Sequence, residues 1–352
     1  MNVMPRMPLM TGSPAPSTRV PHGGFPAGSH GANAVEISLN AAVISIDRDA
    51  PCLLMVRNRD SAGEHLSLPA GPFVPGVHAS LELGLRDWVV RQTGVDLGYL
   101  EQLFTFGDQR GNAGDAANDT PTVSMGYMAL TTPDHCQTSA SRQWIGAYDF
   151  MPWEDWREGR PDILADEIEP RLKEWTTSQA ASASVELPAY TEALHIAFGL
   201  DGAQWDEERV LDRYELLSVT GLLDHPSFGT DKRVDNKYPV GASTPVSHAH
   251  RRILAAALGR LRAKIKYRPV LFELMASEFT LFELQRTVEA ILGSRLHKQN
   301  FRRLVESGGL VDATTDIRTH TGGRPAKLFR FRREVLMERP APGVRVRAGL
   351  AA

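Results

Sequence analysis

Residues 279–309 read FTLFELQRTVEAILGSRLHKQNFRRLVESGG, two amphipathic segments separated by Gly293. The Thr-x-x-Glu of residues 280–283 has the spacing of a capping box, which predicts a helix that continues through Leu292. The glycine ends that helix, and a second helix is predicted over 296–307. Two short helices around a glycine-containing turn indicate a helix-turn-helix.

The second of these helices has two chemically different faces. Phe301 and Leu304 are apolar and predict a side that packs on the domain. The other side carries four candidates for contacts with base edges and phosphates: Lys298, Asn300, Arg302 and Arg303. The alternative is a solvated helix face, with Asn300 acting as a cap or facing water.

A β-wing is predicted after this helix. The polar stretch 312–327 leads into an apolar strand at 328–331, and Gly322-Gly323 permits a close backbone approach to a partner. Four side chains of this segment are expected near nucleic acid: Arg318, His320, Arg324 and Lys327. Upstream, residues 250–266 predict a helix with one apolar stripe, made of Ile253, Leu254, Ala257, Leu258, Leu261 and Ile265.

Charge is distributed unevenly along the chain. Residues 246–338 carry 18 Lys and Arg against 9 Asp and Glu, a net charge of +9. The net charge of the whole chain is −3, so the other residues together carry −12. A basic C-terminal segment on an acidic body indicates an anionic polymer as the partner of that segment, with a merely solvated basic surface as the alternative.

The C-terminal segment resembles the winged helix of the Nudix-related transcriptional regulators. Five runs carry this resemblance: Leu258–Ile265, Tyr267–Val270, Phe279–Gln285, Asn300–Arg303 and Gly323–Phe329. It implies a homodimeric repressor of genes of NAD synthesis or salvage, bound to a palindromic operator and controlled by a nucleotide. The branch most similar to this chain is the one that responds to ATP; another branch responds to ADP-ribose.

Residues 71–95 resemble the Nudix box, whose helix glutamates hold Mg²⁺ or Mn²⁺ against a diphosphate. Aligned on Gly94, the chain has Asp87-Trp88 in place of the family's Arg-Glu and Arg91-Gln92 in place of its paired glutamates. A hard divalent cation needs clustered anionic oxygens, which this set does not supply. The sequence therefore predicts no metal site, no catalytic residues and no required cofactor. The resemblance implies that this domain binds an adenine nucleotide, ATP or ADP-ribose.

Strands are predicted over 35–46, 52–57, 103–107 and 122–131, with a helix over 80–93 capped by Ser80. This order is expected of a Nudix αβα sandwich. The fold class is thus α+β, a Nudix-like sandwich followed by a winged helix-turn-helix. Candidate nucleotide-binding side chains are Arg57, Arg59, Arg86 and Arg91, the last two of which could equally be surface partners of Glu82 and Asp87.

Less is predicted for the rest of the chain. A helix is expected over 205–217, and Trp153 and Trp156 are more typical of a core or interface than of a stack on adenine. The predicted divisions are a disordered tail (1–34), a Nudix-like domain with insertion and linker (35–245), a winged helix (246–338) and a second tail (339–352). Two cysteines and no long apolar run favour a cytoplasmic protein with no membrane segment.

Two other hypotheses remain open at this point. One is a Nudix hydrolase of ADP-ribose or a related nucleotide diphosphate, which the missing carboxylates argue against. The other is a general nucleic-acid-binding protein that responds to no nucleotide. The sequence does not decide which nucleotide is the effector, or whether it releases or tightens the repressor.

Overall fold

The computed structural model describes residues 35–60, 63–108, 122–132, 142–181, 187–224, 246–319, 325–340 and 342–344. The predicted N-terminal tail, His320 and Arg324 lie outside these residues, as do most of the loop after residue 108 and of the linker before residue 246. We call residues 35–224 the N-terminal domain and residues 246–338 the C-terminal domain.

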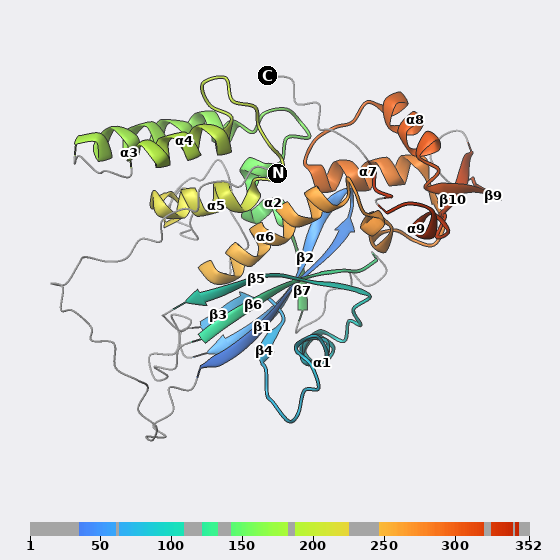
Figure 1. The fold of residues 1–352 in the computed structure, drawn as a ribbon, viewed down its shortest axis with the longest axis horizontal. Coiled ribbons are helices and arrows are strands. Elements are labelled where there is room, and N and C mark those ends of the chain that lie inside the picture. Colours follow the sequence, from blue (N-terminus) through green and yellow to red (C-terminus); the bar gives the residue numbers. More distant parts are fainter. Residues whose placement is uncertain are drawn as a thin grey trace. The chain divides into compact units, whose positions relative to one another are not determined.

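A mixed β-sheet forms the centre of the N-terminal domain (Figure 1). Its described strands are β1 (Glu36–Asp47), β2 (Ala50–Asp60), β3 (Gly63–Ser67), β4 (Ala70–Pro72), β5 (Tyr99–Asp108), β6 (Thr122–Leu130) and β7 (Arg142–Gly146). The order is β3-β2-β1-β6-β5, with β4 on β1 and β7 on β2. β1 runs parallel to β6, and its pairings with β2 and β4 are antiparallel.

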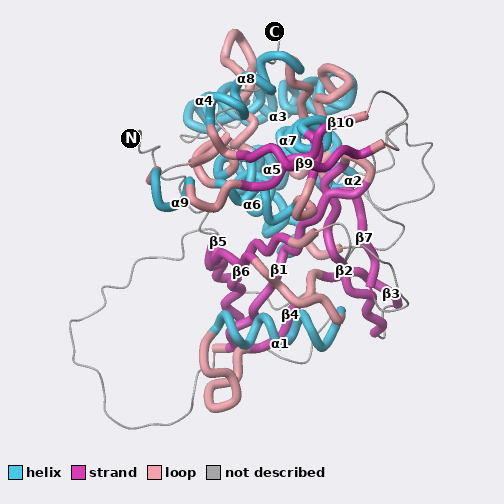
Figure 2. The backbone as a smooth tube through the Cα atoms, turned by 90° about the vertical axis from the view of Figure 1, so that its right-hand side faces the viewer, coloured by secondary structure: helices cyan, strands magenta, loops and turns pink. Residues whose placement is uncertain are grey.

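β1 is apolar in both of its alternating positions because both faces of the sheet are covered. Leu39, Ala41 and Val43 pack with Leu85 and Val89 of α1 (Leu81–Thr93). Ala42, Ile44 and Ile46 belong to a separate, larger core that includes α6 (His248–Lys264). Figure 2 shows α1 below the sheet, on the opposite side from α6. The predicted αβα arrangement is thereby confirmed, and burying each such Val or Leu contributes about 1.5–3 kcal/mol.

The C-terminal domain has the predicted helix-turn-helix and wing. Its elements after α6 are η5 (Pro269–Leu274), β8 (Phe279–Thr280), α7 (Leu281–Leu292), α8 (Lys298–Gly308), β9 (Val311–Arg318), β10 (Ala326–Phe331) and α9 (Val335–Glu338). The capping box of Thr280 and Glu283 is present, and Gly293 ends α7 with a φ of 69°. The three strands pair in the order β8-β10-β9.

Two predicted helix starts were wrong. The helix expected from Trp205 is α5 (Val210–Val219), because the acidic residues before it bind elsewhere: Glu207 and Glu208 both pair with Lys266. The helix expected from Leu296 begins at Lys298 because the Leu296 backbone is used by α7, its N–H donating to Glu289 and its carbonyl accepting from Gln285.

The segment between β7 and α5 is helical, and no element had been predicted there. It contains α2 (Ala147–Phe150), η2 (Pro152–Glu154), η3 (Leu164–Ile168), α3 (Glu169–Ala181) and α4 (Leu187–Phe198). Trp153 is buried in the main core, and Trp156 packs on Trp205 with ring centroids 4.6 Å apart. At the other end of the chain, Val344 lies in the core although it was predicted to be tail.

Candidate functional site

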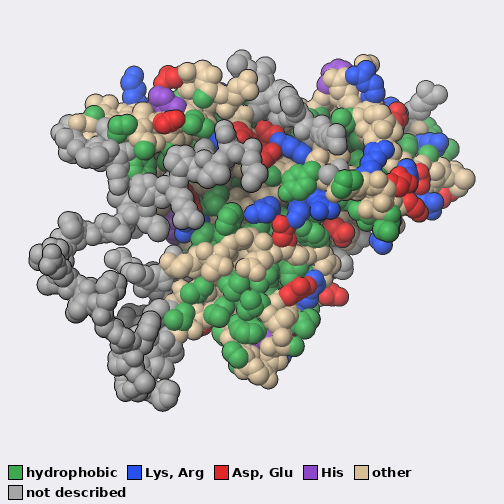
Figure 3. All heavy atoms as spheres, viewed as in Figure 1, with side chains coloured by type: hydrophobic (Ala, Val, Ile, Leu, Met, Phe, Trp, Pro, Cys, Tyr) green, Lys and Arg blue, Asp and Glu red, His purple; other side chains and the backbone are tan. Residues whose placement is uncertain are grey.

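Helix α8 presents the two faces that its sequence predicts. Phe301 and Val305 are buried against the domain. Lys298, Asn300, Arg302 and Arg303 are all exposed. On the face drawn in Figure 3, most Lys and Arg side chains lie over the C-terminal elements.

Unlike seven other arginines of their domain, the basic side chains of α8 have no acidic partner among the described residues. Within the described part of the chain, Lys298, Arg302 and Arg303 form no ion pair and no side-chain hydrogen bond. The seven with acidic partners are Arg252 with Glu215, Arg260 with Glu101, Arg262 with Glu154, Arg286 with Asp49, Arg295 with Glu289, Arg318 with Glu283, and Arg332 with Glu338. The α8 face is therefore left as an unneutralised positive surface, which is the chemistry that phosphates attract.

The wing places its predicted contact residues in different settings. Lys327 is exposed on β10, paired in register with Ile317. Arg318 is held by Glu283 and lies 3.5 Å from the Glu278 carbonyl oxygen, so its guanidinium links the wing to the start of α7. To contact nucleic acid, Arg318 would have to break its ion pair with Glu283 or bind both partners at once.

In the box helix, the side chains at the family's ligand positions are used to hold the backbone. The Gln92 amide donates to the Ala70 carbonyl at 2.7 Å and accepts from the Ala70 N–H at 3.0 Å. Trp88 donates from Nε1 to the Pro72 carbonyl at 3.0 Å. Its ring covers Gly71, where a Cβ would lie 2.3 Å from ring atoms. These residues therefore do not fit a divalent cation.

The remaining charges of this helix are also paired. Arg91 pairs with Asp87 at 2.8 Å, one turn earlier. Among the described residues, no group of three or more His, Cys, Asp or Glu side chains could hold a metal ion.

The predicted nucleotide-binding arginines do not form one cluster of free donors. Arg57 of β2 donates to Gln143 at 3.2 Å, and Arg59 lies in the same strand with a side chain that is not described. Arg86 donates to Glu82 and to the carbonyls of Leu97 and Gly98. Arg86 and Arg91 thus pair with Glu82 and Asp87 of their own helix, the arrangement that the sequence left open as the alternative to phosphate binding.

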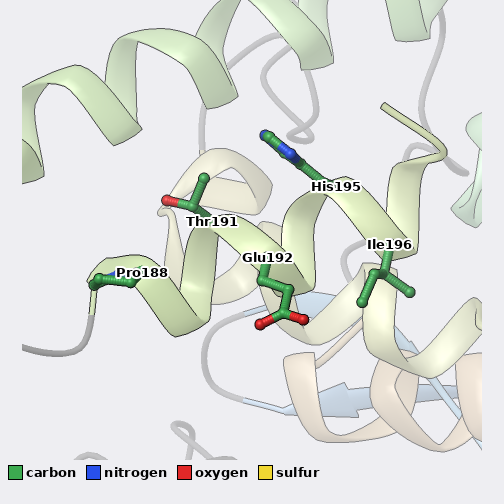
Figure 4. A pocket seen from close by; sticks show the side chains of 5 residues that line it. All are labelled: Pro188, Thr191, Glu192, His195 and Ile196. Atoms are coloured by element: carbon green, nitrogen blue, oxygen red, sulfur yellow. The ribbon is translucent and has the colours of Figure 1, made fainter. Parts of the chain in front are cut away.

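Two hollows are present in the described surface. One, of about 320 Å³, lies between the β1–β2 turn at Asp47–Asp49 and the residues Phe279, Glu283 and Arg318 of the C-terminal domain. The other, of about 570 Å³, follows one face of α4 (Figure 4). Its polar side chains are Thr191, Glu192 and His195, and His195 lies 3.3 Å from Asp201. This second set lacks the cationic donors that a diphosphate needs.

Sequence reasoning missed a cluster of buried charge beside the helix-turn-helix. Glu154, Arg213 and Arg262 have fully buried side chains. One signal was available: Arg262 falls on the apolar stripe of α6, four residues after Leu258, where a solvated arginine is not expected. Nothing in the sequence around Glu154 indicated its partners.

Comparison with known proteins identifies the C-terminal domain. Residues 271–331 match the family model of the NrtR DNA-binding winged helix domain. The ADPR responsive transcriptional repressor NtrR of Acinetobacter baylyi is 42% identical over 82 residues, 23% of this chain. That alignment spans 32% of the relative's own length, less than a third of it.

Similarity to solved structures extends over most of the chain. Shewanella oneidensis NrtR complexed with a 27mer DNA matches with a TM-score of 0.51 at 20% identity, covering 86% of this chain and 95% of that one. A second structure of the same protein gives 0.50 at 20% identity, covering 85% and 94%. The chain therefore carries an NrtR DNA-binding winged helix domain at residues 271–331 and has the fold of NrtR, a Nudix domain followed by a winged helix.

Proposed function

We propose that this protein is a transcriptional repressor that binds a palindromic operator as a homodimer, with α8 in the major groove. The observation that carries the proposal is the exposed basic face of α8, whose Lys298, Arg302 and Arg303 have no acidic partner in the described chain. A protein that neutralises phosphates with such side chains gains affinity by releasing counterions. Two-fold symmetry of the protein would be matched by two half-sites in the operator.

The proposed effector is ADP-ribose, bound by the Nudix-like domain. The support is the similarity to an ADPR responsive repressor, which spans 32% of that relative's length. ATP, implied by the resemblance of the whole chain, is the other adenine nucleotide to test. Because an effector changes operator affinity only through its different affinities for two states, the nucleotide must prefer one geometry of the dimer.

We further propose that the Nudix-like domain does not hydrolyse its ligand. Support comes from the box helix, in which Trp88, Arg91 and Gln92 are bonded to Pro72, Asp87 and Ala70. Converting these positions to a metal site requires new carboxylates and the loss of those bonds.

The experiment is a fluorescence anisotropy titration of the full chain on DNA from upstream of NAD-synthesis and salvage genes, with a random duplex as control. ADP-ribose, ATP and NAD are added in turn, and phosphatase-coupled phosphate release with Mg²⁺ is followed in parallel. Specific binding altered by one nucleotide, without hydrolysis, is expected. Equal binding to both duplexes contradicts the repressor, and Mg²⁺-dependent turnover contradicts the loss of catalysis.

Among the described residues, no helix is both long and apolar enough to span a bilayer.

A further inference from the structure

The C-terminal end of α7 is capped by groups from outside the helix-turn-helix. The last carbonyls of any α-helix have no partner within the helix and need one from elsewhere. Here the Tyr148 hydroxyl donates to the Ala290 carbonyl at 2.6 Å, and Arg262 Nε donates to the Ile291 carbonyl at 2.9 Å. The Trp156 N–H donates to the Gly293 carbonyl at 2.6 Å. Two of these three donors belong to the N-terminal domain.

Arg262 is itself fixed by a buried ionic cluster. Its Nη1 lies 2.6 Å from Glu154 Oε2, and Arg213 Nε lies 2.6 Å from Glu154 Oε1. Arg262 also donates to the Glu154 and Glu207 carbonyls, and Arg213 donates to the carbonyls of Ala197 and Asp206. Glu154 thereby joins α5 and α6 at the point where α7 ends.

The charges in this cluster persist despite complete burial. Burial alone raises the pKa of Glu154, but the two arginines outweigh it and hold that pKa below its ordinary value. Burial also raises the pKa of Tyr148, so its hydroxyl keeps the proton that it donates. Removing one member of a buried ion cluster leaves an uncompensated charge, so such a cluster resists rearrangement.

The turn between α7 and α8 fits closely against this cluster. At Gly293, a Cβ would lie 2.3 Å from the Glu154 carbonyl oxygen and 2.8 Å from Arg262 Nη2. Its φ of 69° is also one that favours glycine. The residue that starts the turn toward α8 is therefore in direct contact with the N-terminal domain.

Two further ion pairs hold α7 and its following turn to the N-terminal domain. Arg286, in the middle of α7, donates to Asp49 of the β1–β2 turn at 2.9 and 3.0 Å. Arg295, in the turn after α7, pairs with Glu158 at 2.6 Å. Singly such pairs contribute little, but here they surround the buried contacts on the same helix.

We propose that Tyr148, Glu154 and Arg262, with Asp49 and Glu158, are positioning residues for operator binding, because they fix α8 in one orientation relative to the N-terminal domain of its own chain. This rests on the proposed function. In a homodimer whose subunits contact each other through other residues, a fixed orientation keeps the two α8 helices at one distance. When one α8 binds its half-site, the second α8 is then already placed at the second half-site.

The test compares two triple variants with the same change in charge. The junction variant is Asp49→Asn, Tyr148→Phe and Glu158→Gln. The control variant is Glu192→Gln on α4, Asp201→Asn in the turn after α4, and Tyr267→Phe in the turn after α6. Asp49 and Asp201 match closely because both have positive φ, 64° and 51°. Affinity for a palindromic operator and for a single half-site is measured for each.

The junction variant is expected to lose about tenfold or more in affinity for the palindrome, since looser tethering lowers the effective concentration of the second helix. Its half-site affinity should equal that of the control variant. Unchanged palindrome affinity contradicts the proposal. An equal loss on the half-site also contradicts it, because the residues would then support only the fold of the winged helix.

Calorimetry separates failure of this proposal from failure of the proposed function. If the wild-type protein shows no preference for the palindrome over a random duplex, the proposed function is wrong. The positioning role is then decided by thermal unfolding: a rigid junction predicts one cooperative transition for both domains, and two separate transitions overturn it. The harsher variant Glu154→Gln, if it folds, should lower or split that transition more than the junction variant does.

Discussion

Helices α1 and α8 both carry two arginines, yet the two helices differ in how those charges are satisfied. In α1, Arg86 and Arg91 pair with Glu82 and Asp87 one turn earlier. In α8, Arg302 and Arg303 have no acidic partner among the described residues. The same residue type therefore stabilises a scaffold in one helix and is left available for an external anion in the other. The two helices therefore differ in unpaired charge and not in the number of arginines.

The largest effect is expected from removing the free charges of α8. Arg302→Ala with Arg303→Ala should weaken operator binding by about tenfold or more per residue that contacts a base, each such contact contributing about 1–3 kcal/mol. The slope of log affinity against log salt should also flatten by about 0.9 for each lost phosphate contact. A salt series of anisotropy titrations measures both quantities.

The matched control for that variant is Lys173→Ala with Arg209→Ala, which removes two positive charges from the N-terminal domain. Nucleotide binding should be unchanged in both double variants. If the control weakens operator binding as much as the α8 variant does, net charge rather than α8 is responsible.

A second effect concerns α6, the helix of the C-terminal domain that packs against the sheet of the N-terminal domain. Leu68 N–H lies 3.4 Å from His250 Nδ1, and His250 Nε2 lies 3.2 Å from Asn40 Oδ1. Burial, with a smaller contribution from His65, lowers the pKa of His250 from 6.5 to about 4. Below pH 6.5 the unfolded chain binds this proton and the folded chain does not. The free energy of unfolding should therefore fall between pH 6.5 and about 4, by roughly 3 kcal/mol at most.

Urea unfolding at pH 7 and pH 5 measures this dependence. His250→Gln should be less stable than the wild type at pH 7 but should lose less stability on acidification. The assignment is wrong if the His250 variant and the wild type lose equal stability between the two pH values.

In α1, the hydrogen bonds between Gln92 and the Ala70 backbone can be removed by substitution. In Gln92→Glu, the new carboxylate can accept from the Ala70 N–H but cannot donate to the Ala70 carbonyl. The free energy of unfolding should fall, by at most about 1–3 kcal/mol, because the partly buried Ala70 carbonyl loses its donor. Chemical denaturation measures it, with the exposed Gln299→Glu as control. Equal stability of the two variants would show that the Gln92 bonds contribute nothing.

The smallest effect is expected at Arg318. Because this guanidinium already pairs with Glu283, Arg318→Ala should weaken operator binding less than Arg302→Ala does, and should lower stability by at most about 1 kcal/mol. Single-variant titrations compare the two. A greater loss at Arg318 would place the wing, rather than α8, at the centre of the interface.

Local patterns made the helix-turn-helix predictable. The capping box, Gly293 and the apolar stripe of α6 each act within a few residues, so the sequence around them carries the signal. The strand β1 was likewise predicted from its alternating and apolar residues, but the burial of both of its faces was not. The charged face of α8 followed from helical periodicity alone.

The contacts between the domains could not be predicted in the same way. Glu154 and Arg262 are more than one hundred residues apart, and their pairing depends on how α6 crosses the sheet. The predicted first residues of α5 and α8 were wrong for a related reason. The turns before these helices are held by Lys266 and by Glu289, which belong to other parts of the chain. The pairing of Arg86 and Arg91 was open in the sequence because a glutamate or aspartate four residues away permits a pair without requiring one.

The central claim is that nucleic acid is bound through α8 and not through α1, and photocross-linking tests it most directly. A photoreactive phenylalanine analogue is placed at Asn300 in one protein and at Arg91 in another, and each is irradiated with labelled operator DNA. Cross-links to operator bases are expected from position 300 and none from position 91. Cross-links from position 91, or none from position 300 in a protein that still retards the operator, would contradict it.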